Sequence, residues 1–326
     1  MIALIERINI IDSYQYAYLT TRISGMKNRL VTQEKFRQIL NCKSLDEIPH
    51  FLENTDYKKI PYKNLEESNK ILDECFAQLL NKICVFAPSA VKDCVFVLKE
   101  YAKLQDLKSM IKFNINDDKT FTDILSQITG IQKNVTDLNK IKEFKKFKKN
   151  ILNHLEKKEF SQIDYKLENR FFKSIKKIID KRNLAIVKNF IKKRADIINI
   201  TIKLRSLLIG YDTDCYLDYG FIEPTKIKNQ KSIESFISSI TRTEYHMIFS
   251  KIMDEFNKNE YRGIFDDAMD KFLMEFSKNA KSSDPFGLGL VFWFILTKDR
   301  EVRKLKAVIK IISDGLTKDY FEVFAW

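Results

Sequence analysis

Apolar residues recur at helical spacing along most of the chain. Between residues 72 and 83 they step by three and four, and the same steps return over 91–102 and 138–155. Over 167–179 the step is four. This spacing puts apolar side chains on one face of an α-helix, whereas a half-buried strand would alternate at every second position. The pattern therefore predicts an all-α protein.

Residues that typically begin helices occur at the places that this pattern predicts. Ser44 and Glu47 have the spacing of a capping box, and Pro88 and Pro285 fit the first turns of helices. The longest apolar run is FGLGLVFWFIL, residues 286–296. A helix that spans a membrane needs about 20 apolar residues, so we expect this shorter run to form a buried helix.

The composition excludes several fold classes. Of 326 residues only 8 are Gly and 5 are Pro, about a third of the usual share, whereas barrels, sandwiches and doubly wound sheets need many tight turns. The five Cys form no C-x-x-C pair, which argues against a zinc ribbon or redox motif and suits a reducing cytoplasm. The start, MIALIERINIIDS, lacks the pattern of a signal peptide.

The chain contains a repeated block. KSLDEIPHFLENTDY, Lys43 to Tyr57, aligns without a gap with KSIESFISSITRTEY, Lys231 to Tyr245, and a weaker copy, KTFTDILSQIT, begins at Lys119. A second block follows each copy: a charged residue, two spacers, a polar residue and then Leu or Ile. Its three copies begin at Lys103, Asp196 and Glu301, and their polar positions are Asp106, Asn199 and Lys304. The repetition predicts three related helical units, residues 1–113, 114–209 and 210–326.

The positive charge is concentrated in the middle unit. The net charge is +13, and residues 133–205 hold 22 Lys/Arg and 8 Asp/Glu, so this segment carries +14 and the remainder −1. Such a segment presents a basic surface, which suits a solvated face, an acidic protein, anionic lipid or nucleic acid. Nucleic-acid binding usually adds Arg or exposed aromatic residues, whereas Lys dominates here and the Phe residues fall on the apolar stripes.

Motifs of catalysis are missing from the sequence. It has no G-x-x-x-x-G-K-[ST], no G-x-G-x-x-G and no H-E-x-x-H, and its three His are far apart. We therefore predict no catalytic residue, no cofactor and no metal ligand. The alternatives that stay open are a basic helical nucleic-acid-binding protein, an unrecognised helical enzyme and a helical-repeat adaptor.

Four stretches resemble a known family. They are Tyr16-Ala-Tyr-Leu-Thr-Thr-Arg22, LVTQEKFRQILNCKSLDEIPHFLENTDY at 30–57, DIINITIKLR at 196–205, and DPFGLGLVFWFILTKDREVRKLKAVIKIISDGL at 284–316. In order and coverage they are similar to the C subunits of prokaryotic V/A-type ATPases, whose eukaryotic counterpart is the V-ATPase d subunit. The resemblance implies an all-α funnel or socket of three similar units about a pseudo-threefold axis.

The resemblance also implies a function. Members of this family are non-catalytic central-stalk subunits that transmit torque in ATP-coupled ion transport. One copy per complex sits on the membrane proteolipid ring, peripheral to the cytoplasmic face of the membrane, and receives the central shaft subunits. No nucleic acid is expected as a partner. The direction of the ATP reaction and the choice of proton or sodium stay open.

Candidate structural or interface residues come from the repeated blocks and their flanks. They are Arg22, Thr55, Tyr57, Asp196, Asn199, Arg205, Thr243, Tyr245 and Glu301. We expect the Thr and Tyr residues at the ends of the short blocks to cap helices and pack locally; a role as polar surface contacts is the alternative. Lys304 and Lys103 depart from the family pattern, so the Asp196/Asn199 copy should carry the structural role best.

Overall fold

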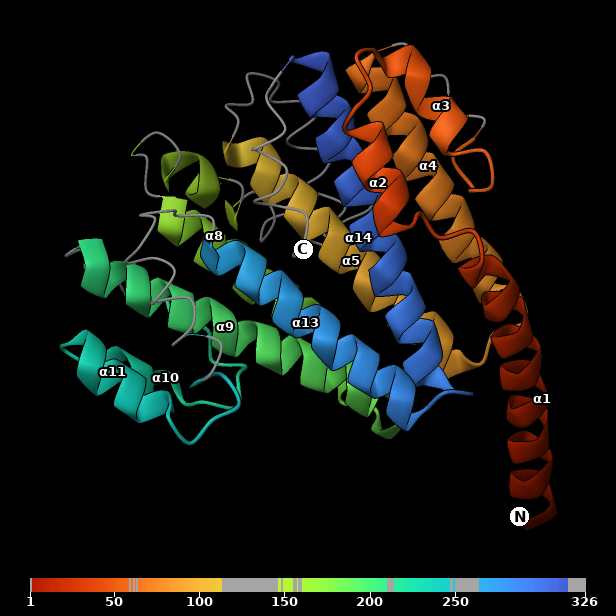
Figure 1. The fold of residues 1–326 in the computed structure, drawn as a ribbon. Coiled ribbons are helices and arrows are strands. Elements are labelled where there is room, and N and C mark those ends of the chain that lie inside the picture. Colours follow the sequence, from red (N-terminus) through yellow and green to blue (C-terminus); the bar gives the residue numbers. More distant parts are fainter. Residues whose placement is uncertain are drawn as a thin grey trace. The chain divides into compact units, whose positions relative to one another are not determined.

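The computed structural model describes residues 2–58, 60, 62, 64–112, 146–147, 149–154, 157, 160–209, 214–246, 249 and 264–315. Every regular element in these ranges is a helix (Figure 1), so the all-α prediction is confirmed. The short block that begins at Lys119 and the stripe over 138–145 lie outside the described residues.

The chain forms two compact units. Residues 1–95 and 251–326 together form one, which we call the terminal unit, and residues 96–250 form the other, the central unit. The terminal unit thus combines the two ends of the chain. The division into 1–113, 114–209 and 210–326 stays a prediction.

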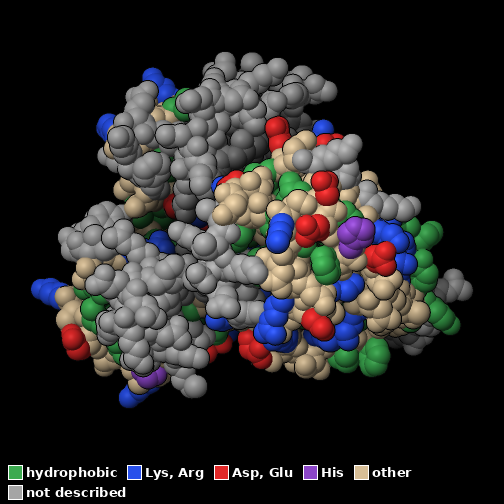
Figure 2. Space-filling view, turned by 45° about the horizontal axis from the view of Figure 1, so that its top comes forward, with side chains coloured by type: hydrophobic (Ala, Val, Ile, Leu, Met, Phe, Trp, Pro, Cys, Tyr) green, Lys and Arg blue, Asp and Glu red, His purple; other side chains and the backbone are tan. Residues whose placement is uncertain are grey.

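Charged side chains of both signs lie interspersed on the face shown in Figure 2. Lys and Arg alternate there with Asp and Glu, and hydrophobic side chains appear along the right-hand edge. The described part of this face therefore carries a mixed charge.

In the terminal unit, the long helix α14 (Leu288–Ser313) packs against three other helices, α1 (Ile2–Lys27), α4 (Leu65–Cys84) and α13 (Ile264–Ser283). The short elements α2 (Gln33–Ile39), η1 (Leu45–Glu47) and α3 (Ile48–Phe51) lie between α1 and α4 in sequence. Figure 1 shows α2, α3 and α4 gathered around the C-terminal part of α14.

The first half of α14 forms the predicted buried helix. Residues 288–296 are all buried, which confirms that expectation for most of the apolar run. Pro285 lies before the helix and not in its first turn, because Gly287 is the N-cap and the Asp284 carboxylate accepts the Gly289 N–H at 2.9 Å. A Cβ at Gly289 would overlap the carbonyl of Ala280, so α13 and α14 need a glycine here to approach closely.

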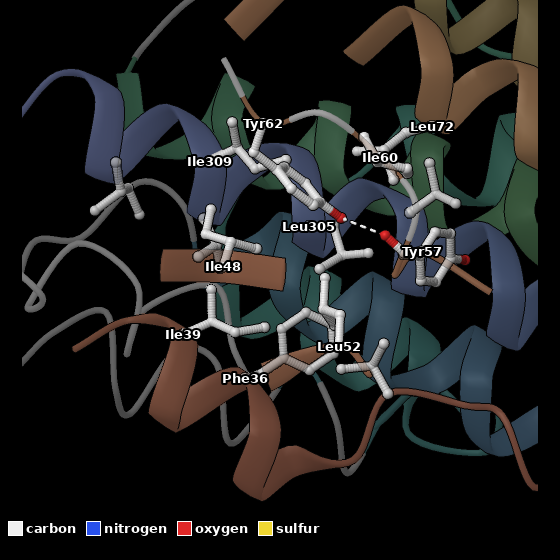
Figure 3. Close-up of a cluster of buried hydrophobic side chains, with 14 residues drawn as sticks. Phe36, Ile39, Ile48, Leu52, Tyr57, Ile60, Tyr62, Leu72, Leu305 and Ile309 are labelled. Carbon is white, nitrogen blue, oxygen red and sulfur yellow. Dashed lines mark hydrogen bonds between the residues drawn. The ribbon is translucent and has the colours of Figure 1, made fainter. Parts of the chain in front are cut away.

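The second half of α14 covers the short helices with apolar side chains (Figure 3). Leu305 and Ile309 are fully buried against Phe36, Ile48 and Leu52. The predicted capping box is wrong at its first residue. The Ser44 side chain makes no cap bond, because this segment begins as a 3₁₀ turn and the Glu47 carboxylate accepts the N–H of Lys43 at 3.2 Å.

In the central unit, α9 (Ala185–Ile209) packs against α8 (Phe160–Ile179) and α10 (Pro224–Lys228). The turn η2 (Arg182–Leu184) joins α8 to α9, and α11 (Ile233–Ile240) follows α10. Residues 96–112 of α5 (Ser89–Lys112) belong to this unit as well. Leu167, Phe171, Ile175 and Ile179 are all buried on α8, as their spacing predicts.

A buried ionic group joins three of these helices. The Glu168 carboxylate of α8 accepts two bonds from the Arg194 guanidinium of α9, at 2.5 and 2.7 Å. The Lys108 ammonium of α5 lies 2.6 Å from the same carboxylate, and the Arg194 guanidinium lies 4.6 Å from the Tyr101 ring centre. Burial alone would raise the pKa of Glu168, but Arg194 and Lys108 lower that pKa to about 2.

The lowered pKa predicts how stability depends on pH. Replacing Glu168 by Gln should destabilise the protein by about 3–5 kcal/mol at neutral pH, because it leaves Arg194 buried without its anion. Since the folded pKa of Glu168 lies below its ordinary value of 4.5, the stability from ionised Glu168 is complete above that pH and is lost as pH falls toward 2. Urea unfolding at several pH values should show the wild-type advantage over Glu168→Gln shrinking in this window.

The double variant Glu168→Met with Arg194→Met supplies the control. It removes both members of the pair. The Lys108 ammonium is not left without an anion, because the Asp164 carboxylate lies 3.6 Å from it. It should lose less stability than Glu168→Gln. An equal loss in the two variants, independent of pH, contradicts the role of the ion pair.

Candidate functional site

The Asp196 carboxylate anchors two distant segments to α9. It is fully buried, and it accepts the backbone N–H groups of Phe221 at 2.9 Å and Ile222 at 3.0 Å. It also accepts the Tyr245 hydroxyl at 2.8 Å. The loop before α10 and the turn after α11 are therefore fastened to one side chain. Nearby, the Lys193 ammonium pairs with the Glu244 carboxylate, and Asn199 binds the same loop from the next turn of α9. We call these five residues, Lys193, Asp196, Asn199, Glu244 and Tyr245, the central clamp.

Asn199 extends the central clamp by one turn of α9. Its amide donates to the carbonyl of Leu217 and accepts the N–H of the same residue, both at 2.8 Å. The loop passes so near α9 that a Cβ at Gly220 would overlap the Asp196 carboxylate. Only a glycine fits at this position without moving the carboxylate.

Glu301 is the corresponding buried carboxylate on α14, and it too binds segments that are distant in sequence. Its carboxylate accepts the N–H of Val31, just before α2, at 2.6 Å. Burial and the charge of Glu301 raise the pKa of the nearby Tyr57 phenol. The Lys298 ammonium lies 2.7 Å from Glu301 and 3.0 Å from the Asp56 carboxylate. We call Lys298, Glu301, Asp56 and Tyr57 the terminal clamp.

The two clamps are structural equivalents. Lys298 and Glu301 lie 105 residues after Lys193 and Asp196, and the Asp56–Tyr57 pair lies 188 residues before Glu244–Tyr245. The ion pair of Lys298 with Asp56 has its counterpart in that of Lys193 with Glu244. In both, a buried carboxylate on a long helix accepts a loop N–H, and the tyrosine of the short block lies beside it.

A threonine turn aims each tyrosine at its carboxylate. Thr55 Oγ1 donates to the carbonyl of Leu52 at 2.7 Å and accepts the Tyr57 N–H at 3.2 Å. Thr243 Oγ1 donates to the carbonyl of Ile240 at 2.7 Å and accepts the Tyr245 N–H at 3.4 Å. This is a side-chain turn in which the hydroxyl replaces a backbone group.

These threonines and tyrosines pack locally, as expected. Thr55, Tyr57 and Tyr245 are buried, and Thr243 is half-buried. The physical reason is the threonine turn, which directs the tyrosine ring inward against a long helix. Tyr245 adds a long-range hydrogen bond to Asp196 that the short block alone does not reveal. A role of these residues at an interface stays a prediction.

Arg22 and Arg205 belong to neither clamp. Arg22 is half-buried on α1, with its guanidinium 3.4 Å from the Tyr18 hydroxyl and 6.0 Å from the Tyr18 ring centre. Arg205 is exposed on α9. The other seven predicted residues divide between the clamps and their threonine turns.

Sequence reasoning missed the lysines of the clamps. Lys193 and Lys298 stand three residues before their carboxylates, a spacing that was visible in the sequence. In α5, Glu100 has the same spacing to Lys103 and Leu104 as Glu301 has to Lys304 and Leu305. Glu100 is buried and lies 2.8 Å from the Lys103 ammonium, and Leu104, like Leu305, is fully buried. The block that begins at Lys103 stays a prediction.

The electrostatics of the clamps suit anchoring. Burial raises the pKa of Asp196 and of Glu301 above their ordinary values, although their donors oppose this shift. Burial and the neighbouring carboxylates also raise the pKa of Tyr57 and Tyr245, so both phenols stay protonated. Within the described ranges no group of three or more His, Cys, Asp or Glu could hold a metal ion.

Comparison with known proteins identifies relatives over nearly the whole chain. The family model described as ATP synthase (C/AC39) subunit matches residues 19–323. The chain is 25% identical to the C subunit of the A-type ATP synthase of Methanocaldococcus jannaschii, over 92% of this chain and 84% of that protein. It is 21% identical to the protein of the same name from Thermococcus kodakarensis, over 95% and 90% of the two chains.

The central clamp predicts how much stability the loss of its tyrosine hydroxyl costs. Tyr245→Phe removes a donor to the buried Asp196 carboxylate, which should cost about 2 kcal/mol of unfolding free energy. Tyr62→Phe is the matched control, because the Tyr62 hydroxyl donates to a neutral carbonyl, that of Tyr57, at 3.3 Å. It should cost about 1 kcal/mol or less. Urea denaturation measures both variants, and equal losses would count against the clamp.

Gly220 offers a steric test. Gly220→Ala should destabilise the protein by about 1–3 kcal/mol, because the new methyl group displaces the Asp196 carboxylate from its donors. Gly25→Ala is the control: nothing lies near the added methyl on helix α1, and alanine there should stabilise by about 0.5–1 kcal/mol. Thermal unfolding should separate the two variants in opposite directions. A neutral Gly220→Ala contradicts the close approach.

Proposed function

Because the chain belongs to the ATP synthase (C/AC39) subunit family, we propose that it is a non-catalytic central-stalk subunit of a rotary ATPase. In this proposal it links the central shaft to the membrane proteolipid ring and transmits torque for ATP-coupled proton or sodium transport. The observation that carries the proposal is the family match over residues 19–323, which covers the chain almost from end to end. Membership of a rotary ATPase follows from the family; the coupling role is the proposal.

Two similarly built units support the proposal of a socket of three units. In the terminal unit, the segment before α2 is fastened to α14 through Glu301, and the turn after α3 through the ion pair of Asp56 with Lys298. In the central unit, the loop before α10 and the turn after α11 are fastened to α9 through Asp196. We propose that Glu100 and the block at Lys119 belong to a further unit of this kind.

The clamps suit a part that carries torque. A coupling piece must transmit rotation without absorbing it, so its segments need to be fixed to one another. Each clamp fastens a loop and a turn to a long helix through a buried carboxylate, and the ion pair of Glu168 and Arg194 joins α8 to α9. Close-packed helices with such cross-links deform little.

The proposed location is the cytoplasmic face of the membrane, peripheral to it, in one copy per complex. No helix of the described ranges is both long and apolar enough to cross a membrane. Partners in this proposal are the central shaft subunits and the proteolipid ring, and nucleic acid is not among them. The alternative of a basic nucleic-acid-binding protein predicts association with RNA or DNA instead.

Affinity purification from native membranes tests the proposal. The tagged chain, extracted with a mild detergent, should elute in a large assembly that hydrolyses ATP. Membrane vesicles depleted of the chain should still hydrolyse ATP but should lose ATP-driven ion uptake, and the added wild-type chain should restore it. Gly25→Ala should restore uptake as the wild type does. A chain that elutes alone, or with RNA, overturns the proposal.

A further inference from the structure

Large hydrophobic side chains are exposed where α1 passes the turns that precede α5 and α14. Tyr14 and Tyr18 of α1 are 74% and 50% exposed, Val85 and Phe86 after α4 are 48% and 70% exposed, and Phe286 before α14 is 74% exposed. We call these five residues the aromatic tip. They come from three segments that are far apart in the sequence.

Direct contacts bring the three segments together. The Tyr18 and Phe86 rings meet edge to face with their centres 6.4 Å apart. The Thr20 hydroxyl, on the next turn of α1, donates to the carbonyl of Phe286 at 3.1 Å. Because Phe86 and Phe286 are each exposed by 70% or more, their rings project from the surface and do not line a groove.

The backbone of Phe86 adds an independent sign of a function. Its φ is +60°, in the left-handed region that side chains other than those of Gly and Asn rarely adopt. Val85 is extended with φ −68° and ψ 122°, and the Ala87 N–H bonds the Cys84 carbonyl at 3.3 Å. This is a type II turn with phenylalanine where glycine or asparagine is favoured. The chain thus keeps a strained and exposed ring, a combination found at binding sites.

A band of positive charge lies behind the aromatic tip. The Arg22 guanidinium lies over the Tyr18 ring. The ammonium groups of Lys281 and Lys27 lie 3.9 and 5.9 Å from the ring centre of Trp293. Desolvation and the charge of Lys27 lower the pKa of Lys281, as expected for two cations that lie close together. Lys27 follows Tyr18 by nine residues, about 13 Å along the helix.

We propose that the aromatic tip inserts into the interface of an anionic lipid bilayer, with Arg22, Lys27 and Lys281 facing the headgroups. Tyr and Phe side chains gather at the boundary between headgroups and acyl chains, and basic residues a short distance behind them are attracted by anionic lipids. A projecting tip with a basic band fits such a surface better than it fits a protein helix, which needs a groove. The inference goes beyond the proposed coupling function and does not depend on it.

Vesicle co-sedimentation of the purified full-length chain tests this inference. The probe is phosphatidylcholine vesicles with about one-third phosphatidylglycerol, compared with phosphatidylcholine alone. The wild type should bind the anionic vesicles more tightly. Phe86→Asn should weaken this binding by about tenfold, the share expected of one partly inserted ring. Because asparagine accepts the left-handed backbone, the same variant should keep or raise the melting temperature, so lost binding cannot be attributed to unfolding.

Phe221→Asn is the matched control. Phe221 is 52% exposed, and the Lys192 ammonium lies 4.9 Å from its ring centre, but it lies in the central unit and outside the aromatic tip. It should bind vesicles as the wild type does. Equal losses in Phe221→Asn and Phe86→Asn, equal binding to neutral and anionic vesicles, or no binding at all each overturn the inference.

The assay separates this inference from the proposed function. It contains only the purified chain and lipid, so absent vesicle binding leaves the purification of the rotary complex to decide the coupling role. If Phe86→Asn leaves vesicle binding unchanged but releases the chain from the purified complex, the tip docks on a protein and the lipid proposal is wrong.

Discussion

A buried carboxylate that accepts hydrogen bonds from distant parts of the same chain is the interaction on which the described fold depends. Asp196 and Glu301 each stand on a long helix and accept backbone N–H groups from distant segments, and Asp196 also accepts a hydrogen bond from the Tyr245 hydroxyl. Removing a carboxylate from water is unfavourable unless its oxygen atoms are well paired, so each clamp holds only when all its segments are in place. This requirement joins loop, short helices and long helix into one cooperative arrangement.

The same requirement determines which charged side chains of residues 160–205 remain at the surface. Over residues 160–205 the four acidic residues all have partners within the protein: Asp164, Glu168, Asp180 and Asp196. Two of them, Glu168 and Asp196, are fully engaged in the interior. The lysines of the segment are therefore only partly neutralised, and many lie on the surface of α8. With Glu168 and Asp196 in the interior, the charge that this segment presents to solvent is mostly positive.

The two ends of the terminal unit have different physical characters. Around the short helices, carboxylate and tyrosine bonds satisfy polar groups within the unit. At the aromatic tip, rings and a strained turn are left facing outward, with cations behind them. An internally fixed body with one outward-facing apolar end is consistent with a part that works against a surface.

Local patterns in the sequence determined the helices and the repeated short blocks, because helical periodicity and the threonine turn involve residues only a few positions apart. The match between Lys43–Tyr57 and Lys231–Tyr245 correctly marked two turns that have the same hydrogen bonds. Only the tertiary structure decided which carboxylate each tyrosine meets. Tyr57 pairs with Glu301 from the opposite end of the chain, and both clamp carboxylates also accept backbone N–H groups, which every sequence has and no motif marks. A polar residue destined for such a partner looks the same in sequence as one that faces water, and for that reason the long-range partners of the clamp residues could not be predicted.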